Sequence, residues 1–407
     1  MTPDNNRVVI VSPYQSSARH AVDAGFEVYS VVDPAREPDA HLAEVVRYST
    51  EVHRADLADA PALRSLVRRL ADRVDAAHVL GMGRWEDTHL PVAEVAQAMR
   101  RGQNPPSAIQ YLNDKAATRR LLHDNNLSIV DFAVFGSPAE VDKVPRTLEA
   151  PVIAKPTRLS ASRGVMLIRD DADLAAWRAR LAGYRYTGPV IVEEFLRGPE
   201  FSVETLTADG EHHVVGITAK RVTPGMVEIG HLHPAPLAEP DRVAITELVT
   251  AFLDAAGYRF GPAHTELVLT GLGPRIVESQ ARFGGDRIPL LVRLATGMDM
   301  DAVVYQALTG KPVEQPVAGR FGCVSYFRLA PGVLRWVSGL AEIARLPFVR
   351  ELDFPFAPGD VLPDFVDTFT RHGHVVVDAG SPAEAESRIA LVDELLTADI
   401  EPVGGTP

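Results

Sequence analysis

A row of polar side chains near the middle of the chain combines an acid, an amide and a cation. Glu278, Gln280 and Arg282 stand at every second position within the stretch Arg275–Asp286. Successive side chains of a β-strand alternate between its two faces, so these three lie on one face if the stretch is extended. Such a face can bind a metal ion and an anionic substrate, or it can simply be hydrated by solvent.

The stretch Ala263–Leu269 supplies a partner strand, because it also alternates and the turn-forming residues of Thr270–Pro274 separate it from the first stretch. A hairpin folded about Leu272 then places Glu266 directly opposite Glu278. Two carboxylates that face each other across a strand pair lie about 5 Å apart and repel each other. The sequence therefore predicts a cation between them.

The same register places His264 opposite Gln280. A small set of oxygen ligands suits Mg²⁺ that is held jointly with substrate phosphates, whereas zinc prefers His or Cys ligands. Glu266 and Glu278 are therefore candidate Mg²⁺ ligands. The alternative is a solvent-facing hairpin whose register is shifted by one residue.

A lysine at the end of an apolar strand is a candidate for a phosphate contact. Lys155 lies within Pro151–Ile168 and precedes a loop that contains Ser160, Ser162 and Gly164. Backbone N–H groups of such a loop can surround a phosphate together with one cation. The alternative is a hairpin with an exposed lysine, because the loop is short of glycine and lacks the spacing of a Walker motif.

The stretch Pro189–Leu206 could hold a nucleobase and its sugar. The main chain of Glu194 and Leu196 could meet the edge of an adenine, and the ring of Phe195 could cover its face. Glu200 could accept hydrogen bonds from ribose hydroxyl groups. The alternative is an ordinary hairpin with hydrated acidic side chains.

The segments around these candidates predict several domains. Over residues 1–105 the alternation of strands and helices indicates a doubly wound, mostly parallel sheet. No GxGxxG motif follows the first strand, so a dinucleotide site is only weakly indicated. The expected strands are Arg7–Ser12, Glu27–Val32 and Ala76–Leu80, and the expected helices are Ser16–Ala24, Pro61–Arg73 and Leu90–Arg100.

The pattern changes after residue 105. A linker is expected at Gly102–Ala108, and a helix at Asn113–Asn125 begins with Asn113 or Asp114 as its N-cap. The chain then becomes rich in strands until about residue 309, and Pro312–Pro316 marks another boundary. In the last part we expect strands at Gly322–Leu329 and Val375–Asp378 and a helix at Ala383–Leu396.

The composition is that of a globular protein: 46% of the 407 residues are hydrophobic and 23% are charged. The net charge of −13 argues against nucleic acid or an anionic membrane as the main partner. The single cysteine, Cys323, excludes a disulfide framework and a multi-cysteine metal site. The first residues lack the apolar core of a signal peptide, and no apolar run approaches the roughly 20 residues that cross a bilayer. A cytoplasmic location is therefore expected.

Taken in order, five segments resemble the ATP-grasp superfamily of carboxylate–amine ligases, and the resemblance covers about residues 1 to 400. They are the helix with Lys115, the VIAKP strand, EEFLRGPE, the HTE strand and ESQARFGGD. Within the superfamily the chain is most similar to the L-amino acid ligases, which make dipeptides or acylate an amine-bearing metabolite. That similarity is carried by VEIGHLHPAPL, by HTE, and by the C-terminal sequences RLAPGVLRWVSGL and RHGHVVVDAGSPAEA.

The resemblance implies a fold of mixed α/β and α+β character. An N-terminal Rossmann-like domain would cover residues 1–105. An ATP-grasp domain would clamp ATP between a small lobe (106–190) and a large lobe (191–311), and an α+β domain would follow (312–407). A homodimer is compatible with the resemblance.

The resemblance also implies which residues bind ATP. They are Lys115, Lys155, Ser160, Ser162 and Gly164 for the phosphates, Lys220 near the γ-phosphate, Glu193 and the backbone of Glu194, Phe195 and Leu196 for adenine, and Glu200 for ribose.

Two Mg²⁺ ions, for which Mn²⁺ can substitute, would be bound by Glu266 and Glu278, and Gln280 would complete the site. The family usually has Asn in place of Gln280, and its phosphate loop usually carries more glycine. Arg282 would bridge the transferred phosphate and the substrate carboxylate, while Glu228 and His231 would face the amino-acid substrate.

The implied reaction has two steps. A substrate carboxylate attacks the γ-phosphate of ATP, and an amine then attacks the resulting acyl-phosphate and displaces phosphate. Either His231 or His264 would serve as base or as oxyanion donor. Asp286 is a candidate for holding a substrate amine, and its alternative role is to cap a helix at Ile288–Ala295. Two alternatives stay open: a biotin-carboxylase-like or purine-pathway enzyme of the same fold, and a nucleotide-binding protein without activity.

Overall fold

The computed structural model describes residues 5–143, 148–159 and 162–402, so the predicted phosphate contact Ser160 lies outside the described residues. The N-terminal part is a parallel four-stranded sheet in the order β3-β2-β1-β4. The valines of β1 are fully buried, which explains why this strand is apolar throughout. Its strands are β1 (Arg7–Val11), β2 (Glu27–Val32), β3 (Glu51–Arg54) and β4 (His78–Leu80), and its helices are α1 (Ser17–Asp23), α2 (Asp39–Tyr48), α3 (Ala60–Arg73) and α4 (His89–Ala98).

The predicted parallel sheet is confirmed, and the three predicted strands and helices of this part lie where they were expected within a few residues. The sequence did not predict β3 or α2. The sequence of β3 is EVHR, and this strand lies at the edge of the sheet with half-exposed side chains. A polar edge strand lacks the apolar run from which a strand is predicted.

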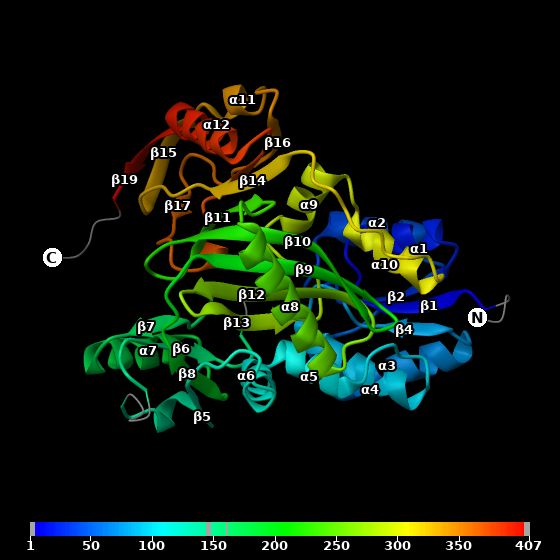
Figure 1. Ribbon diagram of the computed structural model, residues 1–407. Coiled ribbons are helices and arrows are strands. Elements are labelled where there is room, and N and C mark those ends of the chain that lie inside the picture. Colours follow the sequence, from blue (N-terminus) through cyan, green and yellow to red (C-terminus); the bar gives the residue numbers. More distant parts are fainter. Residues whose placement is uncertain (1–4, 144–147, 160–161, 403–407) are drawn as a thin grey trace.

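A second, antiparallel sheet in the order β5-β8-β6-β7 forms the lower left part of the molecule in Figure 1. The helix α7 (Asp171–Gly183) covers it and buries Trp177 completely. The indole of Trp177 donates a hydrogen bond to the carbonyl of Gly164, 2.8 Å away, and thereby fixes the end of the predicted phosphate loop. The strands are β5 (Phe132–Phe135), β6 (Val152–Pro156), β7 (Met166–Ile168) and β8 (Val190–Glu194), and the short helix η2 is Pro138–Glu140.

The centre of the molecule is an eight-stranded antiparallel sheet in the order β13-β12-β9-β10-β11-β14-β18-β16 (Figure 1). Residues 311–318, which contain the predicted boundary, have neither helix nor strand. The sheet nevertheless continues across them, since β11 pairs with β14. The strands are β9 (Glu200–Ala208), β10 (Glu211–Val222), β11 (Glu228–His233), β12 (Gly261–Thr270), β13 (Gly273–Gln280), β14 (Phe321–Tyr326), β16 (Val349–Asp353) and β18 (His374–Ala379).

Three helices pack on the end of this sheet that β13 forms: α5 (Pro106–Asn113), α6 (Lys115–Asp124) and α8 (Glu239–Ala256). The predicted linker Gly102–Ala108 was wrong in its second half, because α5 begins at Pro106, which fits the first position of a helix. The predicted N-cap Asp114 is confirmed, because its carboxylate accepts from the backbone N–H groups of Ala116 and Ala117. These caps fix the position at which Lys115 enters the site.

The C-terminal part completes the large sheet and adds a small one in the order β17-β15-β19. The helix α9 (Ile288–Thr296) packs on β14, and α10 (Met300–Leu308) packs on α1 of the N-terminal part. The remaining elements are β15 (Gly332–Ser338), α11 (Leu340–Ile343), β17 (Val361–Leu362), the short helix η3 (Thr368–Thr370), α12 (Pro382–Leu395) and β19 (Thr397–Glu401). The predicted division of the chain at residues 105, 190 and 311 stays a prediction.

Among the described helices, none combines the length and the apolar character that a membrane span requires.

Candidate functional site

The predicted hairpin exists, and its polar positions have the predicted register. Glu266 pairs with Glu278, and His264 pairs with Gln280. A bulge after Glu266 shifts the register by one residue, so that Leu267 faces Ile276. The bulge keeps the two acids opposite each other while the apolar part of the hairpin turns toward the core under α8.

Two lysines lie at the paired acids. The Nζ atom of Lys220, on β10, is 2.6 Å from Glu266, and the Nζ atom of Lys115, on α6, is 2.7 Å from Glu278. Burial would raise the pKa of Glu266, but Lys220 and His264 outweigh it and hold the pKa well below its usual range. Glu266 is therefore ionised, and the side chains of Glu266 and Glu278 each keep about a fifth of their surface exposed, at 21% and 19%.

The donor set fits Mg²⁺ that takes most of its ligands from a phosphate substrate. The described residues contain no group of three or more His, Cys, Asp or Glu side chains arranged to hold a metal ion by themselves. The amide Nε2 of Gln280 donates to Glu278 at 2.9 Å, while its Oε1 is buried without a hydrogen-bond partner among the described residues. Two carboxylates and one unpartnered amide oxygen are oxygen ligands of the kind that Mg²⁺ accepts.

His264 lies beside these acids and is held by two of them. Its Nδ1 is 2.6 Å from Glu204 and its Nε2 is 3.2 Å from Glu266. Burial alone would lower the pKa of His264, but Glu204 and Glu266 outweigh it and raise the pKa to about 9. A protonated imidazole donates hydrogen bonds, which favours the predicted role of His264 as an oxyanion donor over its predicted role as a base. Both roles stay predictions.

Lys155 and Glu193 form a buried cluster with Arg119, a residue of α6 that the sequence analysis missed. The Glu193 carboxylate is 2.6 Å from Nζ of Lys155 and 2.9 Å from Nε of Arg119. Burial would raise the pKa of Glu193, but Arg119 and Lys155 outweigh it and lower the pKa to about 2. Arg119 also donates to the carbonyl of Ile276 at 2.8 Å, which ties β8 to β13.

Both carboxylate oxygens of Glu193 bind cations and its exposed fraction is 4%, so its side chain positions Lys155. The predicted adenine contact of Glu193 stays a prediction. Arg119 could have been found from the sequence, because it stands four residues after Lys115 and therefore on the same face of the helix.

The segment after β8 keeps part of its predicted role. The backbone N–H of Glu194 donates to the carbonyl of Asp131 at 3.0 Å, so this donor is not available to a base. Phe195 is half-buried, with the guanidinium of Arg197 5.3 Å from its ring centre, and Leu196 follows it at the turn into β9. Phe195 and Leu196 stay predicted adenine contacts.

Glu200, at the start of β9, faces the same lysine as Glu266. Its carboxylate is 4.0 Å from Nζ of Lys220. Burial raises the pKa of Glu200, and Lys220 opposes this increase. The predicted ribose contact therefore lies beside the predicted phosphate contact.

The described part of the phosphate loop has the backbone shape that its small residues allow. Gly164 has φ of 73°, and a Cβ atom there would lie 2.5 Å from Leu181 and 3.0 Å from Pro156. Ser162 Oγ is 3.4 Å from the carboxylate of Glu228, and Nζ of Lys115 donates to the carbonyl of Leu159 at 3.1 Å. The loop thus lies against both predicted phosphate and substrate contacts.

Arg282 connects the site to the N-terminal part. Its Nε is 2.7 Å from Glu86, a residue of the short helix η1 (Glu86–Thr88), and its Nη1 donates to the carbonyl of Phe283. Burial would raise the pKa of Glu86, but Arg282 and Lys115 outweigh it and lower the pKa. The sequence analysis missed Glu86, because nothing in its surroundings distinguishes it from a solvated acid.

A second group of charges lies between β11 and the C-terminal part. Asp286 contacts His231 at 3.0 Å and Arg371 at 2.6 Å. Its alternative role as a helix cap is corrected, because Arg287 is the N-cap of α9 and no side chain caps that end. Glu228 is 3.4 Å from Lys220, which also contacts Glu266, so this group adjoins the paired acids.

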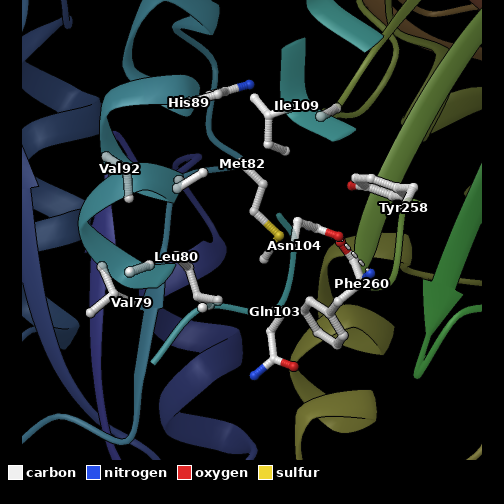
Figure 2. A pocket seen from close by; sticks show the side chains of 15 residues that line it. Val79, Leu80, Met82, His89, Val92, Gln103, Asn104, Ile109, Tyr258 and Phe260 are labelled. Atoms are coloured by element: carbon white, nitrogen blue, oxygen red, sulfur yellow. Dashed lines mark hydrogen bonds between the residues drawn. The ribbon is translucent and has the colours of Figure 1, made fainter. Parts of the chain in front are cut away.

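A cavity between β4, α4 and the large sheet is not the site. Met82 and Ile109 point into it, and the rings of Tyr258 and Phe260 bound it (Figure 2). Its volume of about 30 Å³ holds one or two water molecules, and most of its walls are apolar. None of the predicted site residues lines it.

Two protein families match this chain. The ATP-grasp domain matches residues 148–289, which contain the hairpin, the lysines Lys155 and Lys220, and Arg282. The L-amino acid ligase C-terminal domain 2 matches residues 325–401. Phosphoribosylamine–glycine ligase from Streptomyces coelicolor is 30% identical over 332 residues, 75% of either chain. The chain belongs to the ATP-grasp family of ligases.

Other relatives of this ATP-grasp ligase include amino acid ligases. Alanine–anticapsin ligase from Bacillus subtilis is 29% identical over 190 residues, which make up 41% of this chain and 40% of that protein. An L-amino acid ligase from Bacillus licheniformis has the same fold, with a TM-score of 0.81 at 24% identity over 98% of this chain and 100% of that one. The ATP-grasp fold predicted from the sequence is confirmed.

The relatives are ligases that form C–N bonds with ATP, so the chain is an ATP-dependent ligase of that class. ATP-grasp enzymes use ATP and typically Mg²⁺. Both agree with the paired acids and lysines of the site.

Proposed function

We propose that this ligase forms an amide bond between an amino acid and an amine or second amino acid, through an acyl-phosphate and with release of ADP and phosphate. One observation carries the proposal: Glu266 and Glu278 face each other, and one lysine contacts each of them. That arrangement suits an ATP triphosphate meeting a carboxylate, because two anions approach each other only where cations screen them.

The first step is phosphoryl transfer. An oxygen of the substrate carboxylate attacks the γ-phosphorus, the bond to the bridging oxygen of ADP breaks, and ADP leaves. Lys115 and Lys220 would bind the phosphates, and Arg282 would lie between the phosphate and the carboxylate. Glu266, Glu278 and Gln280 would hold two Mg²⁺ ions, which supply positive charge to the phosphate oxygens.

The second step is aminolysis. The amine nitrogen attacks the acyl carbon, the C–O bond breaks, and phosphate leaves with that oxygen. His231 is the better base of the two predicted histidines, because its Nε2 contacts Asp286. An Nε2–H that donates to Asp286 leaves Nδ1 unprotonated, and Nδ1 has no partner among the described residues.

The substrates are proposed to be small molecules. Glu228 and His231 lie three residues apart on β11, and they would face an amino acid whose carboxylate reaches Arg282. One relative is an alanine–anticapsin ligase, and a ligase named for joining alanine to a second small molecule agrees with this class.

The test is ADP release from Mg-ATP with pairs of amino acids and amine metabolites. We expect release that requires both partners and yields one amide per ADP. Release that depends on bicarbonate would instead support a carboxylase-like reaction. Nucleotide binding without turnover on any pair would overturn the proposal in favour of a binding protein.

A further inference from the structure

Arg371 reaches the substrate side of the site from the C-terminal part of the chain. Its guanidinium contacts Asp286 through two bonds, of 2.6 and 2.9 Å, and its Cζ lies 3.7 Å from the ring centre of Tyr326. A planar guanidinium that is bound by two parallel hydrogen bonds and stacked on a ring has a fixed orientation. The exposed fraction of Arg371 is 9%, so the group is held inside the protein.

The backbone before Arg371 explains why it is held there. The carboxylate of Asp367 accepts from the N–H groups of Phe369 and Thr370, and the Thr370 hydroxyl accepts from the N–H of Asp367. This capping box shapes the turn η3. His372, directly after Arg371, is buried and contacts the carbonyl of Pro363 at 2.9 Å. Arg371 is thus fixed from both sides.

The two acids next to Arg371 differ in how they are bound. Asp286 has three short contacts, at 2.6 and 2.9 Å with Arg371 and 3.0 Å with His231. Glu228 has only long ones, at 3.3 Å with Arg371 and 3.4 Å with Lys220 and Ser162. Hydrogen bonds weaken with distance in this range, so Asp286 is satisfied while Glu228 can form a shorter bond with a further donor.

We infer that Arg371 is a positioning residue that sets the charge of the amine-binding pocket. Arg371 pairs with Asp286, so that of the two acids next to Arg371 only Glu228 can bind a substrate ammonium group. The pocket therefore selects an amino acid with a single ammonium. This inference rests on the proposed function, and it names the substrate class of the same site. Burial would raise the pKa of Asp286, but His231 and Arg371 keep it ionised, which maintains the pair at neutral pH.

The test compares Arg371→Gln, Asp286→Asn and the double variant in an assay with hydroxylamine as the amine. The carboxylate substrates are alanine, leucine, methionine and phenylalanine, with one ammonium each, and lysine, ornithine and 2,4-diaminobutyrate, with two. In Arg371→Gln we expect KM for the active one-ammonium substrate to rise about tenfold or more, because Asp286 then competes for the ammonium. The preference shifts toward the two-ammonium substrates.

In Asp286→Asn the freed Arg371 moves onto Glu228, so KM for the amino acid rises as well. The double variant removes one charge of each sign and recovers most of the loss, while KM for ATP stays within about twofold throughout. Arg371→Lys, which keeps the charge, falls between the wild type and Arg371→Gln. Arg350→Gln is the matched control, because Arg350 binds the buried Asp378 at 2.6 and 3.0 Å elsewhere in the C-terminal part.

The outcomes separate the inference from the proposed function. A wild-type enzyme that turns over none of these amino acids contradicts the proposed function. An active wild type with unchanged amino-acid KM in Arg371→Gln, or a double variant no better than either single one, overturns the inference. If Arg371→Gln and Arg350→Gln only lower the melting temperature alike, Arg371 has a purely structural role, and the inference is also overturned.

Discussion

Two groups of acids and cations lie near each other in the candidate site and differ in how their charges are paired. In the deep group, Glu193 is bound on both oxygens by Lys155 and Arg119, and all three side chains have exposed fractions of 5% or less. In the outer group, Glu266 and Glu278 bind one lysine each and keep about a fifth of their side chains exposed. In the deep group every charge is paired within the protein. In the outer group the exposed parts of the two carboxylates can still bind a ligand.

This difference separates a positioning role from a binding role. A buried cluster whose charges are all paired holds the sheet of β6 and β8, the helix α6 and the hairpin at a fixed distance, since Arg119 also binds the carbonyl of Ile276. An acid with an exposed edge and a buried amide oxygen beside it, as at Gln280, can accept a cation that arrives with ATP. Matched substitutions should therefore lower activity in the outer group and stability in the deep group.

The largest effect is expected from Glu278→Gln. The substitution keeps the shape but removes a charge that would bind Mg²⁺, so turnover should fall by about a thousandfold or more. The measurement is steady-state ADP release together with thermal unfolding. Near-normal turnover in a folded variant would refute the assignment of Glu278 as a metal ligand.

Glu193→Gln should instead lower the free energy of unfolding. It leaves Lys155 and Arg119 as buried cations without a counter-charge, which costs about 3–5 kcal/mol of unfolding free energy. Chemical denaturation of the wild type and the variant measures this cost. A variant as stable as the wild type but without activity would show that Glu193 acts on the substrate, and the comparison would then break down.

The deep group should also govern stability in acid. Glu193 has a pKa of about 2 in the fold against 4.5 as its ordinary value, because Arg119 and Lys155 outweigh the effect of burial. Its contribution is complete above pH 4.5 and is lost as the pH falls toward 2. The difference in unfolding free energy between the wild type and Glu193→Gln should therefore shrink across this window. A difference that stays constant from pH 5 to pH 2 would contradict the assigned pKa.

The smallest effect is expected from Gln280→Asn, which withdraws the amide by one methylene and breaks its 2.9 Å contact with Glu278. Because two acidic ligands remain, the Mg²⁺ concentration for half-maximal activity should change by about two- to fivefold and kcat by less. Titration of activity with Mg²⁺ and Mn²⁺ measures both. Complete loss of activity would mean that Gln280 is a principal ligand.

The sequence predicted the outer group better than the deep one for a physical reason. The register of a hairpin with a short turn follows from alternation within about 20 residues, and Glu266 and Glu278 lie 12 positions apart. Arg119 lies 74 residues from Glu193, and Arg371 lies 85 residues from Asp286. A contact between residues so far apart cannot be predicted from a local sequence pattern, because the contact depends on how whole sheets and helices pack.

The same limit applies to the surroundings of single residues. Glu193 stands in a segment whose composition suits a nucleobase, but only the packing of α6 against β8 shows that its side chain is occupied. Likewise His264 has the position of a base, while Glu204, 60 residues away, keeps it protonated. Position along a strand was predictable from the sequence, and protonation state was not.

The most direct test of the central claim follows an oxygen atom. The amino-acid substrate is labelled with ¹⁸O in its carboxylate, and the released phosphate is analysed by mass spectrometry. Activation through an acyl-phosphate transfers one ¹⁸O atom to each phosphate, because the C–O bond breaks when the amine attacks. Phosphate without label, formed while amide accumulates, would contradict the account.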